Sequence, residues 1–262
     1  MNNKIVYSKN SVYHGDGTNS KKDDIIITSE TTKRLIKDIR DIVRHPLSDN
    51  GIYYNHDETN MLKGYALIIG PSDTIYGHGF YFFEFIFPTD YPHSPPRVIF
   101  HTNDGEVRFH PNLYRNGKVC LSILNTWDGE QWSSCQSLRT VLLTMTTLFH
   151  SKSLLNEPGI TAHHDDFENY HKIVEYKNFS VACLGMIDRK HLPSLFEPFY
   201  SIIKNYFNEH NDEIKKCLDD LNKTYHDKPN TEITIYSHIR VDLDYEKLIA
   251  TFNDINSLIF NK

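Results

Sequence analysis

The sequence lacks paired cysteines, long apolar runs and an excess of positive charge. Its four cysteines stand far apart with no CxxC pair, which argues against a disulfide-stapled secreted scaffold or a four-cysteine zinc site. No window approaches the roughly 20 apolar residues that cross a bilayer, and the first residues contain no apolar stretch typical of a secretory signal. The net charge of -6 argues against binding mainly to nucleic-acid phosphates. We therefore expect an intracellular, cytoplasmic protein (host cytoplasm for a viral chain) without nucleic-acid or membrane partners.

Phosphate-binding loops and metal-ligand spacings are also missing. No glycine-rich loop of the Walker or dinucleotide type is present, and Gly77, His78 and Gly79 are better explained as a hairpin turn. Among the fifteen histidines, the pair His163 and His164 precedes a helical pattern and is expected to be a solvated helix start. We expect neither a cofactor nor a metal.

With 262 residues and 39% hydrophobic content, the chain can bury a sizeable core. Helical periodicity begins at Ser29, which can cap the helix, and ends at His45 because Pro46 follows. Short apolar runs bounded by turn residues predict strands over 61–69, 80–87 and 97–100. The second run does not alternate, so we expect a central strand covered on both faces.

Helical spacing returns after a long loop-rich stretch, over 138–148, 167–187 and 196–221. Residues 233–243 alternate as one strand would, and 248–260 predict a closing helix. This order of elements predicts an α+β domain whose helices pack against an antiparallel sheet.

The segment 110–124, HPNLYRNGKVCLSIL, carries the most chemistry. It places Asn112 shortly before Cys120 in a loop that follows the sheet. A cysteine thiolate can attack a carbonyl, and an asparagine amide can donate to the resulting oxyanion. Buried structural cysteine is common, so these residues alone leave inert packing as an equal alternative.

The wider context resembles the ubiquitin-conjugating enzymes, over roughly residues 29–187. The matching motifs occur in the family's order: GPSDTIYGHGFYFFEFIFPTDYPHSPPRVIF (70–100), the HPN triplet (110–112), GKVCL (117–121), Trp132 with Ser133, and the helix from Leu138. CLSILNTW with the insert DGEQ, and later LLNEPG (154–159), are most similar to the large, apoptosis-inhibitor-associated branch of that family. A weaker resemblance continues to about Tyr225.

The resemblance implies the ubiquitin-conjugating fold. This fold is an antiparallel four-stranded meander with an N-terminal helix and following helices, here with a mainly helical C-terminal extension. We expect a polar N-terminal arm over 1–28, in which residues 5–7 could form a short strand, and a catalytic domain over 29–190. The extension over 191–262 is expected to be helical, then to contain one strand and a helix.

The same resemblance implies that Cys120 accepts ubiquitin, or a ubiquitin-like protein, as a thioester from an activating enzyme. The acyl group then passes to a lysine of a protein substrate or to a ligase. In this reading Asn112 stabilises the oxyanion or fixes the active-site loop, and His110 mainly pins that loop. The account requires the sulfur of Cys120 to be open to solvent.

The sequence departs from the commoner family pattern at Ser122, where many members carry an aspartate near the thioester. Glu157 is the best candidate to replace that carboxylate as a base for the incoming lysine. Two alternatives stay open beside the conjugating enzyme. One is a non-catalytic binding module on the same scaffold, which would usually lack Cys120. The other is a papain-like hydrolase, which would need a histidine that activates Cys120.

Overall fold

The computed structural model describes residues 5–7, 25–227 and 229–260, so most of the expected N-terminal arm lies outside the described residues. Within it, β1 (Ile5–Tyr7) pairs antiparallel with β2 (Ile25–Ile27), which confirms the expected short strand. The first helix, α1, spans Ser29–Arg44 and ends before His45 as predicted. Its cap is Thr28, whose side chain accepts from the backbone N–H of Thr31, and not Ser29.

The central sheet is an antiparallel meander in the order β3-β4-β5-β6. Its strands are β3 (Ile52–His56), β4 (Lys63–Ile69), β5 (Phe80–Ile86) and β6 (Arg97–Phe100). The last three correspond to the three apolar runs, while β3 lies in a stretch whose mixed Tyr, Asn and His residues gave no strand signal. The fold class expected from the resemblance is confirmed.

The helices after the sheet begin with α2 (Leu138–Thr146) and α3 (Phe167–Lys177). The helix expected to reach residue 187 continues from α3 through a π-helical segment (Asn178–Cys183) into α4 (Leu184–Ile187). The extension contains α5 (Tyr200–Glu209), α6 (Asn211–Thr224) and α7 (Tyr245–Phe260). No helix among the described residues combines the length and apolar character needed to span a membrane.

The stretch expected to be a single strand in the extension is a hairpin. β7 (Asn230–Ile233) pairs antiparallel with β8 (Ile239–Asp242). The prediction of one strand was wrong because both arms of a hairpin alternate with the same period of two, and the intervening turn carries no glycine or proline.

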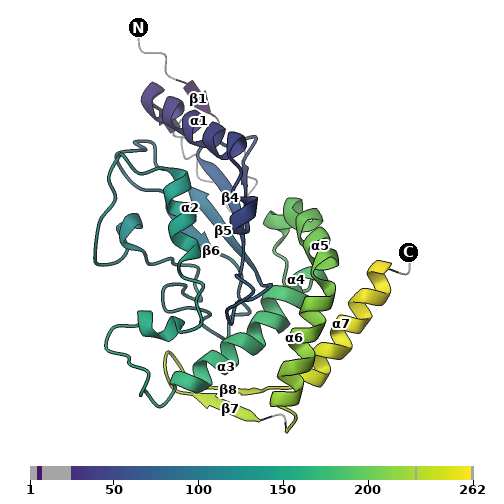
Figure 1. Ribbon diagram of the computed structural model, residues 1–262. Coiled ribbons are helices and arrows are strands. Elements are labelled where there is room, and N and C mark those ends of the chain that lie inside the picture. The colour runs from purple at the N-terminus through teal and green to yellow at the C-terminus, as the bar shows by residue number, and fades with distance from the viewer. Residues whose placement is uncertain (1–4, 8–24, 228, 261–262) are drawn as a thin grey trace, which may run out of the picture.

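Two separate hydrophobic clusters cover the two faces of the sheet. Side chains alternate along β5, so Phe83 and Phe85 belong to an inner cluster that includes α2 and α3, while Phe80 and Phe82 belong to an extension cluster formed with α4–α7. Figure 1 shows α2 on one side of the strands and α5, α6 and α7 on the other. Both faces of β5 are therefore buried, as its unbroken apolar sequence predicted.

Candidate active site around Cys120

The backbone of Cys120 is fastened to the HPN triplet. The N–H of Cys120 donates to the carbonyl of Asn112 at 2.9 Å. In return, Nδ2 of Asn112 donates to the carbonyl of Cys120 at 2.7 Å. Two segments joined by the tight turn at 114–118 are thus held side by side at the residue that carries the thiol.

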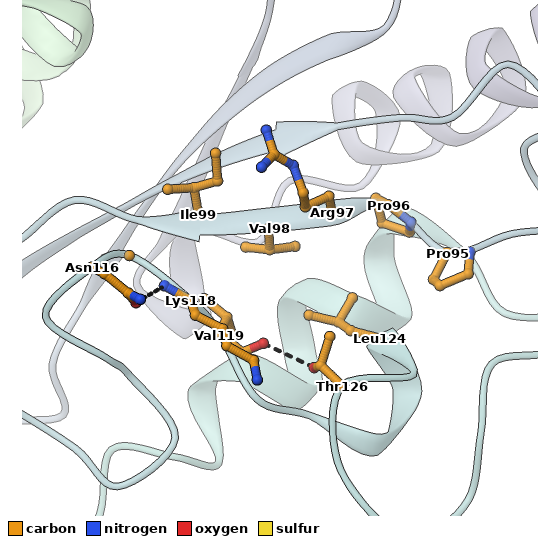
Figure 2. Close-up of a pocket in the computed structure, with 11 residues that line it drawn as sticks. Pro95, Pro96, Arg97, Val98, Ile99, Asn116, Lys118, Val119, Leu124 and Thr126 are labelled. Carbon is orange, nitrogen blue, oxygen red and sulfur yellow. Dashed lines mark hydrogen bonds between the residues drawn. The ribbon is translucent and has the colours of Figure 1, made fainter.

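Thr126 fixes the residues on both sides of the cysteine. Its Oγ1 accepts from the N–H of Leu121 at 2.9 Å and donates to the carbonyl of Val119 at 2.8 Å. Figure 2 shows the second of these bonds, between Thr126 and Val119. The cysteine therefore sits on a rigid backbone, which favours a defined position for its sulfur.

The thiol side chain is covered, and the expectation of a solvent-open sulfur was wrong. Cys120 is only 1% exposed. The residue belongs to neither of the two hydrophobic clusters, however, although its neighbours Val119 and Leu121 belong to the inner one. Cys120 is therefore buried beside the inner cluster without being a member of it.

Two grooves lie beside the cysteine segment. One, of about 360 Å³, runs between Pro95–Ile99 and the segment 116–119 and is shown in Figure 2. The other, of about 720 Å³, lies between Lys118, the inserted loop at Trp127 and Asp128, and Pro158. Both grooves are lined by Lys118 and Thr126, so each borders the segment that holds the thiol.

His110 is hydrogen-bonded to the loop that carries Asn112 and is a poor base at neutral pH. Its Nδ1 accepts from the N–H of Asn112 at 2.9 Å. Burial, followed by the charges of His150 and Arg108, lowers the pKa of His110 to about 3. A group with this pKa is neutral at pH 7 and a very weak proton acceptor.

Asn156 is a site residue that the sequence did not reveal. It closes the short 3₁₀ helix Ser153–Asn156 and donates from Nδ2 to Oδ1 of Asn112 at 3.3 Å. The same nitrogen lies 3.5 Å from Nε2 of His110. Because Asn156 lies 44 residues from Asn112 along the chain, no local pattern could have indicated this contact.

The carboxylate of Glu157 is bonded to the extension. Its Oε2 accepts from the hydroxyl of Tyr236 at 2.7 Å and lies 3.9 Å from the guanidinium of Arg108. Arg108 itself stacks between the rings of Tyr114 and Tyr236, at 3.6 and 4.2 Å from their centroids. Arg108 also donates to the carbonyl of Pro111 in the HPN triplet.

Asp166 holds the hairpin turn that carries Tyr236. Its Oδ2 accepts from the N–H and the hydroxyl of Thr234 and from the N–H of Ile235, at 2.8–3.0 Å. Asp166 is 7% exposed, whereas His163 and Asp165 just before it are exposed, as expected for a solvated helix start. The turn of the β7–β8 hairpin thus reaches the loops of the candidate active site.

The four-stranded meander, the fastened HPN triplet and the following cysteine define an enzyme of the ubiquitin-conjugating class. A family model described as ubiquitin-conjugating enzyme matches residues 34–178. The chain belongs to the ubiquitin-conjugating enzyme family, whose members are thioester-forming transferases.

Its relatives place it near one branch of that family. The chain is 34% identical over 239 residues to ubiquitin-conjugating enzyme E2 Z of Xenopus tropicalis, covering 90% of this chain and 74% of that protein. Human E2 Z is 36% identical over 233 residues, covering 87% and 64%. Human BIRC6, a dual E2 ubiquitin-conjugating enzyme/E3 ubiquitin-protein ligase, is 42% identical over 118 residues, covering 43% and 2%. The expected similarity to the apoptosis-inhibitor-associated branch is confirmed.

Proposed function

We propose that Cys120 is the residue that accepts ubiquitin, or a ubiquitin-like protein, from an activating enzyme. The observation that carries this proposal is the pair of hydrogen bonds between Cys120 and Asn112, which fixes the cysteine next to a segment that lines two grooves. An extended C-terminal tail needs such a groove to bring its last carbonyl to the sulfur.

The reaction is two successive acyl transfers. The Cys120 thiolate attacks the thioester carbonyl on the activating enzyme, the new C–S bond forms, and the activating enzyme's thiolate leaves. A lysine amine of a protein substrate, or the cysteine of a ligase, then attacks, and the Cys120 thiolate leaves in turn. Since the thiol is covered in this structure, loading requires the loops around it to move.

Asn112 fixes the loop in this conformation, because its amide donor is already bonded to the Cys120 carbonyl. Its Nδ2 carries a second N–H that can donate to an oxyanion while the first stays bonded to the Cys120 carbonyl, and loss of one such donor costs about 10²–10³ in rate. His110 supports the loop through Asn112. That Glu157 acts as the base for the incoming lysine, in place of the aspartate of other family members, stays a prediction. The domain limits at residues 28 and 190 and the cytoplasmic location also stay predictions.

The test is a charging assay with ATP, activating enzymes and a panel of modifiers, run with and without thiol reductant. The wild-type chain should form an adduct that reductant removes. Cys120→Ser should give a reductant-resistant oxyester or no adduct, while Cys135→Ser, which changes an exposed thiol, should charge normally. If Cys120→Ser formed as much reductant-sensitive adduct as the wild type, the proposal would be wrong.

The covered thiol favours one second candidate, a non-catalytic module that binds ubiquitin. This candidate predicts ubiquitin binding by titration calorimetry without any adduct under charging conditions. A papain-like hydrolase is disfavoured because the low pKa of His110 makes its imidazole a poor acceptor for the Cys120 proton, and its Nδ1 is already bonded to Asn112.

A further inference from the structure

Three metal-ligating side chains meet where the sheet contacts the extension, away from Cys120. His78 lies in the turn between β4 and β5, His210 lies between α5 and α6, and Glu213 lies in the first turn of α6. One nitrogen of each imidazole and one carboxylate oxygen lie within 4.8 Å of one another. The two parts of the chain that supply them are far apart in sequence, so only the packing of the extension on the sheet brings them together.

His78 is held in a fixed orientation. It is 2% exposed and adopts a left-handed backbone conformation with φ 61°. This conformation is uncommon for residues other than glycine. Its Nδ1 lies 3.0 Å from the hydroxyl of Tyr206. When Nδ1 donates its proton to that hydroxyl, Nε2 keeps a lone pair for a metal ion, which is the usual arrangement of metal-bound histidines.

The other two side chains are accessible from solvent. Nδ1 of His210 lies 2.9 Å from Oε2 of Glu213, and their side chains are 34% and 62% exposed. An exposed ion pair of this kind is screened by solvent and contributes little to stability. Both side chains can therefore rotate toward an ion, and the open side gives that ion an entry path.

We propose that His78, His210 and Glu213 bind a divalent transition-metal ion of the zinc type. Two imidazole nitrogens and one carboxylate oxygen are a donor set that suits Zn²⁺, and water would complete a tetrahedron. Bond lengths of about 2.0–2.2 Å place tetrahedral ligand atoms roughly 3.3–3.6 Å apart. The present separations of up to 4.8 Å are adjusted to this by rotation of the exposed His210 and Glu213 side chains. The ion would fasten the β4–β5 turn to α5 and α6.

Zinc titration of the full chain tests this site directly. Calorimetry should give one site, and saturating Zn²⁺ should raise the thermal midpoint by a few degrees, since an ion that binds only the folded state stabilises it. Mg²⁺ at the same concentration should give no shift, because it requires oxygen ligands.

Variants at the exposed ligands assign the binding to these residues. His210→Ala and Glu213→Gln should each weaken Zn²⁺ binding at least tenfold while the metal-free proteins keep their folded circular-dichroism spectrum. The variant His163→Ala removes an exposed histidine elsewhere and should bind Zn²⁺ like the wild type.

Three results would overturn the proposal. They are the absence of a one-to-one zinc isotherm below about 100 μM, equal affinity in the ligand variants, and loss of binding in the control. Because the readouts are affinity and thermal midpoint, they do not depend on whether Cys120 is charged. A failure here therefore leaves the conjugating activity untouched.

Discussion

The two faces of the central strand β5 are both buried but are covered by different parts of the chain. The inner cluster contains residues that support the thiol loop, among them Val119, Leu121 and Leu124. The extension cluster contains the helices after residue 183 and none of that loop. One segment of the extension crosses over: Ile233 of β7 belongs to the inner cluster, and Tyr236 packs against it. The extension therefore completes the sheet's core and contacts the candidate site through a single hairpin.

Truncating β5 on either face gives the largest expected effect. Phe82 faces the extension, Phe83 faces the inner cluster, and both are 0% exposed. Phe82→Ala and Phe83→Ala should each lower the free energy of unfolding by about 3–5 kcal/mol, through lost burial and the cavity left behind. Urea denaturation followed by far-UV circular dichroism measures both.

Comparing the two variants shows whether the extension unfolds together with the rest of the domain. Similar losses are expected if both clusters belong to one cooperative unit. If only Phe82→Ala lowered the free energy of unfolding by less than about 1 kcal/mol, the extension would contribute little to the stability of the domain. That result would contradict the prediction that the two faces of β5 are equally important.

A buried carboxylate makes the extension side sensitive to pH. Burial raises the pKa of Glu175, on α3, from 4.5 to about 7. Burial also raises the pKa of Tyr245 in the extension, and the nearby charge of Glu175 adds to that shift. The folded state therefore binds the Glu175 proton more tightly than the unfolded state does, so this residue destabilises the fold progressively as pH rises from 4.5 to 7.

Glu175→Gln should remove this pH-dependent loss. Relative to wild type, the variant should gain about 2 kcal/mol of unfolding free energy at pH 8, and the gain should shrink toward pH 4.5. Urea denaturation across this range is the measurement. An equal difference between the two proteins at pH 4.5 and pH 8 would be inconsistent with a raised pKa.

Removing one hydroxyl from the hairpin turn gives the smallest expected effect. Tyr236→Phe loses the donor to Glu157 but keeps the ring against Arg108. We expect a loss of about 1 kcal/mol, equivalent to a roughly fivefold slower transfer from Cys120 to lysine, because the loops that carry Glu157 and Pro111 are held less firmly. Single-turnover discharge of the thioester measures this step.

Tyr114→Phe is the matched control, since its ring packs on the other face of the same guanidinium. It should discharge at the wild-type rate. If Tyr236→Phe also transfers normally while its unfolding free energy falls, the hairpin is a purely structural contact and has no influence on the site.

Much of the fold could be predicted from local patterns. The unbroken apolar run of β5, the stop before Pro46 and the helical stripes after residue 138 each reflect a periodicity or a backbone restriction within a few residues. β3 and the β7–β8 hairpin could not be placed correctly. A strand of mixed polarity carries no distinct period, and two short paired strands repeat the same alternation as one long strand.

Local patterns likewise predicted only part of the candidate site. Cys120, Asn112 and His110 stand in one short motif and could be named together. The residues bonded to them or to Glu157 from elsewhere could not, because Asn156 and Tyr236 meet their partners across 44 and 79 residues of chain.

Residue chemistry and short-range spacing in the amino-acid sequence were enough to indicate the candidate nucleophile, most strands of the sheet and the family to which the chain belongs. Only the folded structure showed that the thiol is covered, that Glu157 is bonded to a tyrosine of the extension, and that the extension covers the second face of β5. The exposure of a side chain and its bonding partners depend on which distant segments pack together, and this packing is a property of the whole folded chain.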